Sequence, residues 1–346
     1  MPSTEEAEAF GFKTARGTLF VGGSPRGDLT DAVLSVEARL PLHGRAHAEL
    51  HLLNWSGADL AFQDLRLGET VGIAFGPEEI LVFAGEITGF EERYGDGAPV
   101  LVLLLEDLLH RLGRMRHNRR FEAMTAGDVV DEVIGEANLS GEIELGTANA
   151  TWLQMNESSL AFIMRLASAQ GIALRLAAGR VRAKAEEQDP DPVALNPDAG
   201  TAKSVRLVAD LNHQPSRVSV QGHDLAADEG ATHEVSALTP APRGTTAADE
   251  LARLGWDTGS VLPHPFARRQ AEAEARATGQ FSRAAARFVH GEILARGDPR
   301  LHAGGEVTLS GVSTRLRGTY RIADCTHLFG GGGYETRLTV QKADLA

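Results

Sequence analysis

The stretch TWLQMNESSLAFIMRLASAQGIALRLAAGRVR, residues 151–182, carries the most consistent local signals in the chain. Asn156 or Ser158 is placed to cap a helix. The apolar residues that follow recur at the spacing of one helical face, namely at Leu160, Ile163, Met164 and Ala167. Gly171 comes where such a helix ends. Alternating apolar residues around an Ala178–Gly179 turn then predict a strand pair. The stretch is therefore expected to form a helix, a turn and a hairpin, and it contains no obvious catalytic group.

The composition is that of an ordinary folded protein. With 346 residues and 42% hydrophobic residues, the chain is long enough for two or three domains with buried cores. No apolar run approaches the ~20 residues that a membrane span requires, and Met1–Lys13 lacks the basic and apolar regions of a signal peptide. The single cysteine, Cys325, excludes an intrachain disulfide and a thiolate zinc cluster. These features predict cytoplasmic synthesis and no membrane anchor.

The charge balance argues against nucleic-acid or membrane partners. A net charge of −13 disfavours attraction to phosphates and to anionic lipid surfaces. One local exception is the basic cluster Arg111–Arg120, RLGRMRHNRR. A solvated turn or an acidic neighbouring chain is favoured over phosphate as its surroundings. The cluster is therefore an interface candidate whose partner is left open, and no specific nucleic acid is expected.

The first half of the chain divides into three parts. Residues 1–15 are expected to be a flexible lead. Strand signals separated by Gly-rich turns then run through residues 16–112 and predict a first β-barrel domain. An α+β insertion is expected over residues 113–200, where Thr125 and Asp128 resemble a capping box that opens a helix.

The second half is expected to form a second β-barrel domain over residues 201–346. Residues 229–265 have several Pro and Gly residues and little periodicity, which is typical of a long loop. Residues 266–286 are rich in helix-forming residues and predict a helix. The strands within 205–222 are assigned to this domain, with completion of the first barrel as the alternative.

The two β-rich parts share one pattern of glycines and alternating apolar residues. The first copy comprises Gly68, Glu69, Val71, Ile73, Gly85, Ile87, a loop at 95–97, Leu101–Leu103 and Asp107. The second copy comprises Gly305, Glu306, Val307, Leu309, Gly318, Tyr320, Ile322, a loop at 330–333, Leu338, Val340 and Asp344. Any two Gly-punctuated meanders share some features, but the order of these signals favours a true duplication.

Histidines and the cysteine give no clear site. His43, His47 and His51 are four residues apart, which on a helix would invite a metal ion, but Pro41 and Gly44 favour a strand that spreads the three rings apart. Cys325 and His327 lie two apart on one strand face without a third orienting group, and a structural role is favoured.

Other chemical signatures are missing from the sequence. The 47 acidic residues show no pairing that identifies a glycosidase, and neither a phosphate-binding loop nor a dinucleotide fingerprint occurs. Met155 and Met164 are expected to fill gaps in a core. The sequence therefore predicts no catalytic, cofactor-binding or metal-binding residues, and no cofactor.

Several segments together resemble the late control gene D family of contractile phage tails, which is similar to the hub part of type VI secretion spike proteins and of extracellular contractile injection systems. They cover most of residues 15–342. The segments are AELHLLN from Ala48, FAGEIT from Phe83, residues 106–139, residues 154–180, VSVQGHD from Val218, and residues 297–340.

The resemblance implies an α+β, β-rich chain with two similar tube-like β-barrel domains and an inserted α+β segment. It also implies a structural baseplate hub that forms a homotrimer with pseudo-sixfold symmetry. Such a hub adapts a threefold spike to a sixfold inner tube and nucleates the tube, and it is not an enzyme. The expected partners are the inner tube protein, other baseplate subunits and a separate spike protein, because the chain ends at Ala346 directly after its last strand. It would be assembled in the baseplate of a phage tail or injection particle.

Two alternatives belong to other classes of protein. One is a cell-wall polysaccharide hydrolase built on a β-scaffold. The other is a glycan-binding β-module, which the three tryptophans, Trp55, Trp152 and Trp256, support poorly. The sequence leaves open which machine contains the chain, what cargo passes its pore, and which residues contact the tube and the spike.

Overall fold

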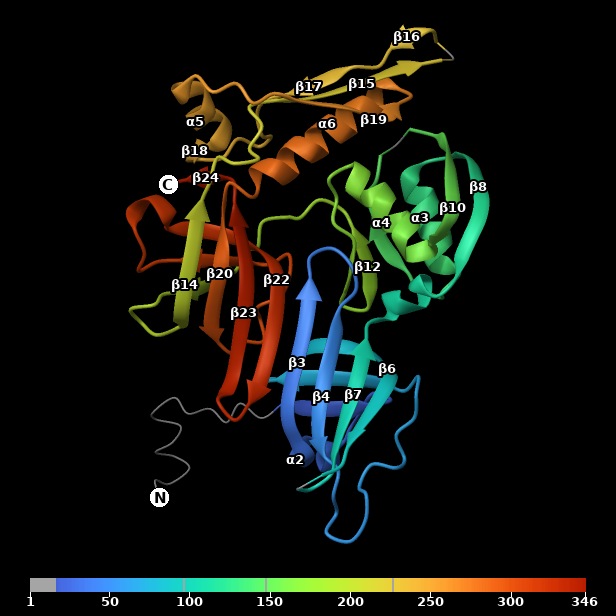
Figure 1. The fold of residues 1–346 in the computed structure, drawn as a ribbon, viewed down its shortest axis with the longest axis vertical. Coiled ribbons are helices and arrows are strands. Elements are labelled where there is room, and N and C mark those ends of the chain that lie inside the picture. Colours follow the sequence, from blue (N-terminus) through green and yellow to red (C-terminus); the bar gives the residue numbers. More distant parts are fainter. Residues whose placement is uncertain (1–16, 96, 147, 226) are drawn as a thin grey trace.

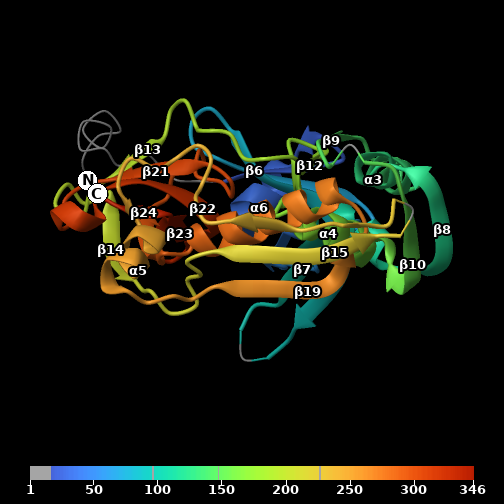
Figure 2. The same cartoon turned by 90° about the horizontal axis from the view of Figure 1, so that it is seen from above.

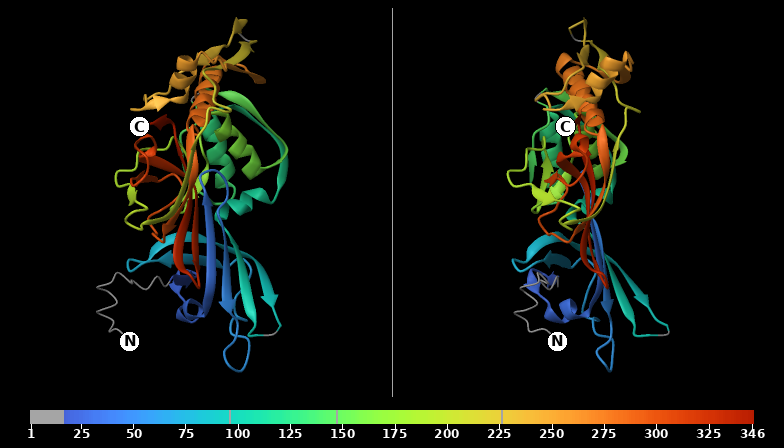
Figure 3. Two further views of the ribbon diagram at one scale, coloured as in Figure 1. Left: turned by 60° about the vertical axis from the view of Figure 1, so that its left-hand side comes forward. Right: turned by 90° about the vertical axis from the view of Figure 1, so that its left-hand side faces the viewer.

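The computed structural model describes residues 17–95, 97–146, 148–225 and 227–346. The expected flexible lead, residues 1–15, lies outside the described residues. The chain forms four parts that follow one another along an elongated molecule: a first β-unit at one end, the insertion and a second β-unit side by side, and a cap at the other end (Figures 1 and 3).

The first β-unit covers the N-terminal third of the described chain. Its elements are β1 (Thr18–Val21), β2 (Ser24–Pro25), α2 (Gly27–Ala32), β3 (Val33–Pro41), β4 (His47–Leu53), β5 (Thr70–Phe75), β6 (Ile80–Arg93) and β7 (Val100–Glu106). Alternating residues of β4 are buried, as the period of a half-buried strand requires.

The insertion follows. Its elements are η1 (Leu108–Gly113), β8 (Arg116–Met124), α3 (Ala126–Gly135), β9 (Gly141–Ile143), β10 (Ala150–Ser158), α4 (Ser159–Ala169), β11 (Arg175–Ala177) and β12 (Arg180–Ala183). The capping box of Thr125 and Asp128 is present and opens α3. Ser158 caps α4, whereas Asn156 lies before it with a φ of 50°. The helix and the hairpin predicted for residues 151–182 are thus confirmed, and the strand β10 at their start is additional.

The second β-unit and the cap are interleaved in sequence. The unit contains β13 (Val193–Leu195), β14 (Ala202–Ala209), β20 (Val289–Arg296), β21 (Glu306–Leu309), η2 (Thr314–Leu316), β22 (Gly318–Gly330), β23 (Gly333–Lys342) and β24 (Asp344–Leu345). The cap contains β15 (Val218–Asp224), β16 (Glu229–Gly230), β17 (His233–Val235), β18 (Thr245–Thr246), α5 (Ala247–Leu254), β19 (Ser260–Ala267) and α6 (Gln270–Ala285). Figure 2 shows the cap strands and α5 from above.

Two local expectations are corrected by this arrangement. Residues 229–265, expected to be a long loop, contain β16, β17, β18, α5 and the start of β19. β16, β17 and β19 pair with β15, and β18 pairs with β24 near the end of the chain. The sequence assigns the strands in 205–222 to the second β-domain: β14 lies there, paired with β20, whereas β15 lies in a separate sheet of the cap, and neither completes the first unit. The helix expected over 266–286 is present as α6.

One sheet of thirteen strands runs through both β-units. Its order is β14-β20-β23-β22-β3-β4-β7-β6-β5-β1-β2, with β21 and β13 attached through β22. The only pairing between the units along this path is β22 with β3. The two units predicted from the sequence are therefore fused edge to edge (Figure 1).

Buried apolar residues form four clusters, one each for the first unit, the insertion, the second unit and the cap. In the insertion, the face of α4 is built from Leu160, Ile163 and Ala167 as expected, together with Phe162. Met164 is only half-buried and packs against the same cluster. Each of these four parts therefore has a core of its own.

The strand order of the first unit is repeated in the second. The path β3-β4-β7-β6-β5 corresponds to β14-β20-β23-β22-β21. Gly68 and Gly304 both have a φ of 86°, and their amides donate to the carbonyls of Ile87 at 2.8 Å and Ile322 at 2.9 Å. The structure thus aligns Gly68 with Gly304, one residue before the Gly305 chosen from spacing, and the duplication itself is confirmed.

The cap is attached to the insertion at a contact between two glycines. A Cβ on Gly279 of α6 would lie 2.4 Å from the backbone of Gln170 and 2.5 Å from the amide nitrogen of Gly171. Gly171 ends α4 with a φ of 72°. Arg283 of α6 also donates to the carbonyl of Ser168 at 2.6 Å. The two helices approach this closely because neither position has a side chain.

We expect Gly279→Ala to destabilise the protein although alanine is the better helix former. The added methyl has no room, so the helices must separate, at a cost of about 1–3 kcal/mol. Gly135→Ala, in the last turn of α3 with nothing within 4 Å of the new Cβ, is the matched control and should be neutral or stabilising. Urea unfolding of both variants measures the difference. Equal stabilities would contradict the close helix contact.

Candidate functional site

The pairing of β22 with β3 is the structural centre of the chain. Its register runs from Asp324 opposite Pro41 to Phe329 opposite Val36. Beyond the last pair, the amide of Leu42 donates to the carbonyl of Ala323 at 2.9 Å, and Arg39 and Asp324 form an ion pair at 3.1 Å. These backbone bonds make two folded units into one rigid sheet, because each residue is held in a fixed register.

A series of buried side-chain contacts reinforces this junction. The ring of His327 lies 3.0 Å from the carbonyl of Leu301 through Nε2 and 2.7 Å from the hydroxyl of Tyr334 through Nδ1. A carbonyl can only accept, so Nε2 carries the proton and Nδ1 accepts from Tyr334. The Tyr334 ring in turn stacks on Phe75 of the first unit, with centroids 4.1 Å apart. The chain of contacts therefore crosses from one unit to the other.

Cys325 and His327 occur together in this network, as their spacing on one strand face predicts. Their Sγ and Nε2 atoms lie 3.5 Å apart, and both residues are buried. Burial lowers the pKa of His327 to about 4 and raises the pKa of the Cys325 thiol above its ordinary value. A neutral thiol beside a neutral imidazole is a poor nucleophile, so this geometry holds the junction together.

Several strand edges of the large sheet have no partner within the described ranges, and two of them, on β14 and β6, correspond to the edges that β3 and β22 use in the junction. The outer edge of β14 is one, since β14 pairs only with β20. The other is the far half of β6: its near half pairs with β5 up to Glu86, but residues 89–93 pair only with β7. Such edges are templates for pairing with another chain. Sequence periodicity did not reveal them, because it identifies strands and not their neighbours.

The three histidines of the 43–51 segment have separate surroundings. His43 accepts a hydrogen bond from the amide of Leu174 at 2.9 Å and lies 3.0 Å from the hydroxyl of Ser168. His51 lies 3.8 Å from Glu49. His43 thus attaches the insertion to the first unit, a role that sequence reasoning missed.

The basic cluster Arg111–Arg120 is bonded mainly within the chain. Each of its five arginines contacts a group of the chain: Arg111 with Glu86, Arg114 with His110, Arg116 with the carbonyl of Asn156, Arg119 with Glu136, and Arg120 with Glu122. Three of the five arginines thus have a carboxylate partner, whereas Arg114 and Arg116 contact an imidazole and a carbonyl. An acidic neighbouring chain as partner stays a prediction.

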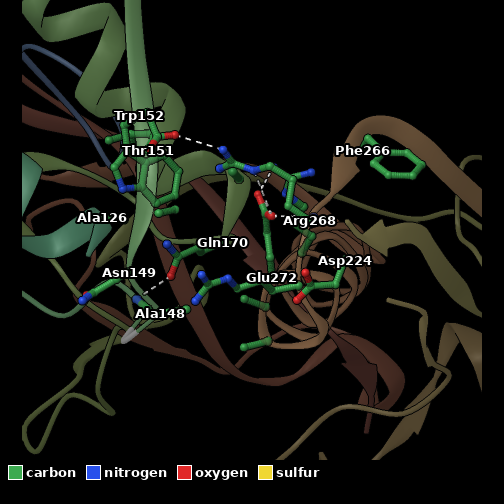
Figure 4. Close-up of a pocket in the computed structure, with 18 of the residues that line it drawn as sticks. Ala126, Ala148, Asn149, Thr151, Trp152, Gln170, Asp224, Phe266, Arg268 and Glu272 are labelled. Atoms are coloured by element: carbon green, nitrogen blue, oxygen red, sulfur yellow. Dashed lines mark hydrogen bonds and ion pairs between the residues drawn. The ribbon is translucent and has the colours of Figure 1, made fainter. Parts of the chain in front are cut away.

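A cavity of about 420 Å³ lies between the insertion and the cap (Figure 4). The guanidinium of Arg268 lies 5.6 Å from the centre of the Trp152 ring and donates to the carbonyl of Thr151 at 2.9 Å. Glu272 accepts from the amide of Arg268 at 2.8 Å and from Arg276 at 2.5 Å. The contacts of Arg268 with Thr151 and Trp152 therefore link the cap to the insertion beside this cavity.

Two negative findings concern the described residues only. Within them, no group of three or more His, Cys, Asp or Glu side chains is placed to hold a metal ion. No described helix is long and apolar enough to cross a lipid bilayer.

Comparisons with known proteins place the chain in a class of tail proteins. A family model described as phage tail baseplate hub (GPD) matches residues 42–332. The chain belongs to this family of baseplate hub proteins. A search of curated protein sequences gave no match.

Solved structures with the same fold come from phages and from a secretion system. A 43 kDa tail protein of prophage MuSo2 from Shewanella oneidensis is 13% identical, with a TM-score of 0.72 over 96% of this chain and 100% of that one. A tail protein from Neisseria meningitidis MC58 is 12% identical, with a TM-score of 0.69 over 95% and 96%. An E. coli component of the type VI secretion system is 14% identical, with a TM-score of 0.64 over 94% and 76%. These likenesses confirm the β-rich fold expected from the sequence.

We expect the stability of the junction to depend on pH through His327. Its pKa is lowered from 6.5 to about 4 by burial, so the unfolded chain binds more protons between these values. The neutral His327 ring makes its full contribution to the free energy of unfolding above pH 6.5. This contribution falls as the pH drops towards 4, by an amount on the order of 3 kcal/mol. His327→Gln keeps a donor and an acceptor but cannot titrate.

Urea unfolding of the wild type and of His327→Gln at several pH values between 7 and 4 measures this effect. The wild type should be more stable at pH 7, and the difference should shrink as the pH falls. Other titrating groups, such as Asp107, act equally on both proteins and cancel. A difference in unfolding free energy that stays constant with pH would contradict the account.

Proposed function

We propose that this chain is the hub subunit of a contractile injection machine, which joins a threefold spike to a sixfold inner tube. The observation that carries the proposal is the duplicated β-unit, fused edge to edge inside one chain, with unpaired edges on β14 of the second unit and on the far half of β6 of the first. Three such chains, each with two equivalent units, would present six equivalent contacts although the assembly itself is threefold.

The proposed assembly is a homotrimer. When an open edge of one chain pairs with a different edge of the next chain, the contact is head-to-tail. Such contacts close into a ring when the rotation from one chain to the next is a whole fraction of a full turn. Three chains of two units each give six positions around a pore. Membership of the baseplate hub family supports this arrangement.

The proposed partners lie on the two faces of the ring. One face would nucleate the inner tube protein, and the other would hold a separate spike protein, with further baseplate subunits at the periphery. The E. coli relative is described as a type VI secretion component similar to the T4 tail proteins gp27 and gp5, which supports a position between tube and spike. The proposal assigns no catalytic role and no cofactor to the chain.

The first test is the mass of the assembled protein. We expect a species of three times the 36.9 kDa chain mass, seen as a ring with a central opening in negative-stain images. Light scattering over a concentration series measures the mass, first with the chain alone and then with its tube and spike partners. A single-chain mass under all these conditions would count decisively against a hub.

The second test concerns nucleation. Addition of the trimer to purified tube protein should shorten the lag before tubes form, because a preformed ring removes the unfavourable first step of assembly. Turbidity and electron microscopy follow the lag and the tube ends, where the hub should be found. An unchanged lag, with hubs absent from tube ends, would contradict the nucleating role.

A further inference from the structure

We infer that β6 of one copy pairs antiparallel with β14 of the next copy, in a register that the chain already contains. Gly89 lies opposite Asp210 of the neighbouring copy, and Tyr94 lies opposite Val205. The inference rests on the proposed ring but specifies more than it: which edges meet, in which direction and at which residues.

The register follows from the alignment of the two units. β6 and β22 each leave one residue unpaired against the next strand, Thr88 in β6 and Ala323 in β22. β3 and β14 likewise share an irregularity, at Leu34 and at Lys203. With these positions aligned, β4 and β20 align as HAELHLL and HGEILAR. One irregularity therefore aligns β6 with β22, and the other aligns β3 with β14. Together they fix the alignment of the two units.

The known junction can now be transferred. Within the chain, Asp324 to Phe329 of β22 pairs with Pro41 to Val36 of β3. The equivalents of these two segments are Gly89 to Tyr94 and Asp210 to Val205, which include the two open edges. The bond from Leu42 to the carbonyl of Ala323 becomes a bond from Leu211 of one copy to Thr88 of the next.

Exposed apolar side chains on the open edge agree with this register. Phe90 and Tyr94 are 40% and 61% exposed, whereas their equivalents are covered: Cys325 is buried in the core of its own unit, and Phe329 packs against the core of the neighbouring unit. In the transferred register they meet Ala209 and Val205. A slip by one residue would turn both side chains to the opposite face, so the apolar contact selects the register.

The two paired segments both carry charged side chains. Residues 205–210 carry Arg206 and Asp210, while residues 89–94 carry Glu91, Glu92 and Arg93. In the transferred register Arg93 lies directly opposite Arg206. Each arginine has a carboxylate as a neighbour within its own chain: Glu91 lies 2.7 Å from Arg93, and Glu292 is opposite Arg206 on β20. The junction between copies therefore carries more charged residues than the junction within the chain, which has Glu37, Arg39 and Asp324.

Cysteine cross-linking tests the register. The pair Arg93→Cys with Arg206→Cys should form a disulfide between copies on mild oxidation and give a covalent trimer on a denaturing gel. The matched control is Glu37→Cys with Leu328→Cys, the equivalent pair inside one chain, which should close within a monomer. Native Cys325 is buried and serves as background in every variant.

Two further variants isolate the register and the direction of the contact. Arg93→Cys with Val208→Cys, displaced by two residues on the same face, should cross-link less by on the order of tenfold, since diagonal Cβ atoms are too far apart for a disulfide. An equimolar mixture of the two single variants, Arg93→Cys and Arg206→Cys, should give covalent dimers, while neither variant alone should.

The mass of each sample before oxidation separates this inference from the proposed function. A trimer by light scattering in which Arg93→Cys and Arg206→Cys do not cross-link, while the intrachain control does, would overturn the register and leave the hub proposal standing. A sample that is monomeric at every concentration, with partners present, would overturn both.

Discussion

The pairing of β22 with β3 is the constraint on which the rest of this structure depends. It joins a second β-unit to the first through backbone hydrogen bonds in one register, and it fixes the angle between two equivalent units within one chain. The buried contacts of His327, Tyr334 and Phe75 then fill the space beside the junction. If every later contact around a ring repeats this one, the geometry of the whole ring is encoded in a single chain.

The insertion and the cap are built around this sheet without interrupting it. His43 holds the insertion to the turn after β3, and the contact of Gly171 with Gly279 holds the cap to the insertion. Neither attachment involves a residue of β6 or β14. The duplicated sheet is therefore free to repeat, while the added parts give one side of the molecule a different surface.

Much of the fold follows from local sequence signals. Three features are each specified by residues only a few positions apart. They are the capping box of Thr125 and Asp128, the helix capped by Ser158 and the turn at Ala178–Gly179. The duplicated glycine pattern was also visible, although spacing alone placed Gly305 where Gly304 belongs. Such features are predictable because the interacting groups are neighbours in the chain.

The parts that were not predictable depend on distant partners. The cap strands in 229–265 include Pro and Gly residues, and they form strands through pairing with β15 or, for β18, with β24. The arginines of the basic cluster read as a patch, yet Glu86 and Glu136 lie beside them in the fold. A strand edge is open when no neighbouring strand of the sheet pairs with it, so no local sequence pattern identifies the open edges.

The repetition of one junction around a ring is the central claim. A cryo-electron microscopy reconstruction of the assembled hub, with no more than threefold symmetry imposed, tests it most directly. The account predicts that the rotation from unit to unit is one sixth of a turn both within and between chains, with β6 beside β14 at each boundary between copies. Unequal rotations, or a boundary at which these two edges stay apart, would contradict it.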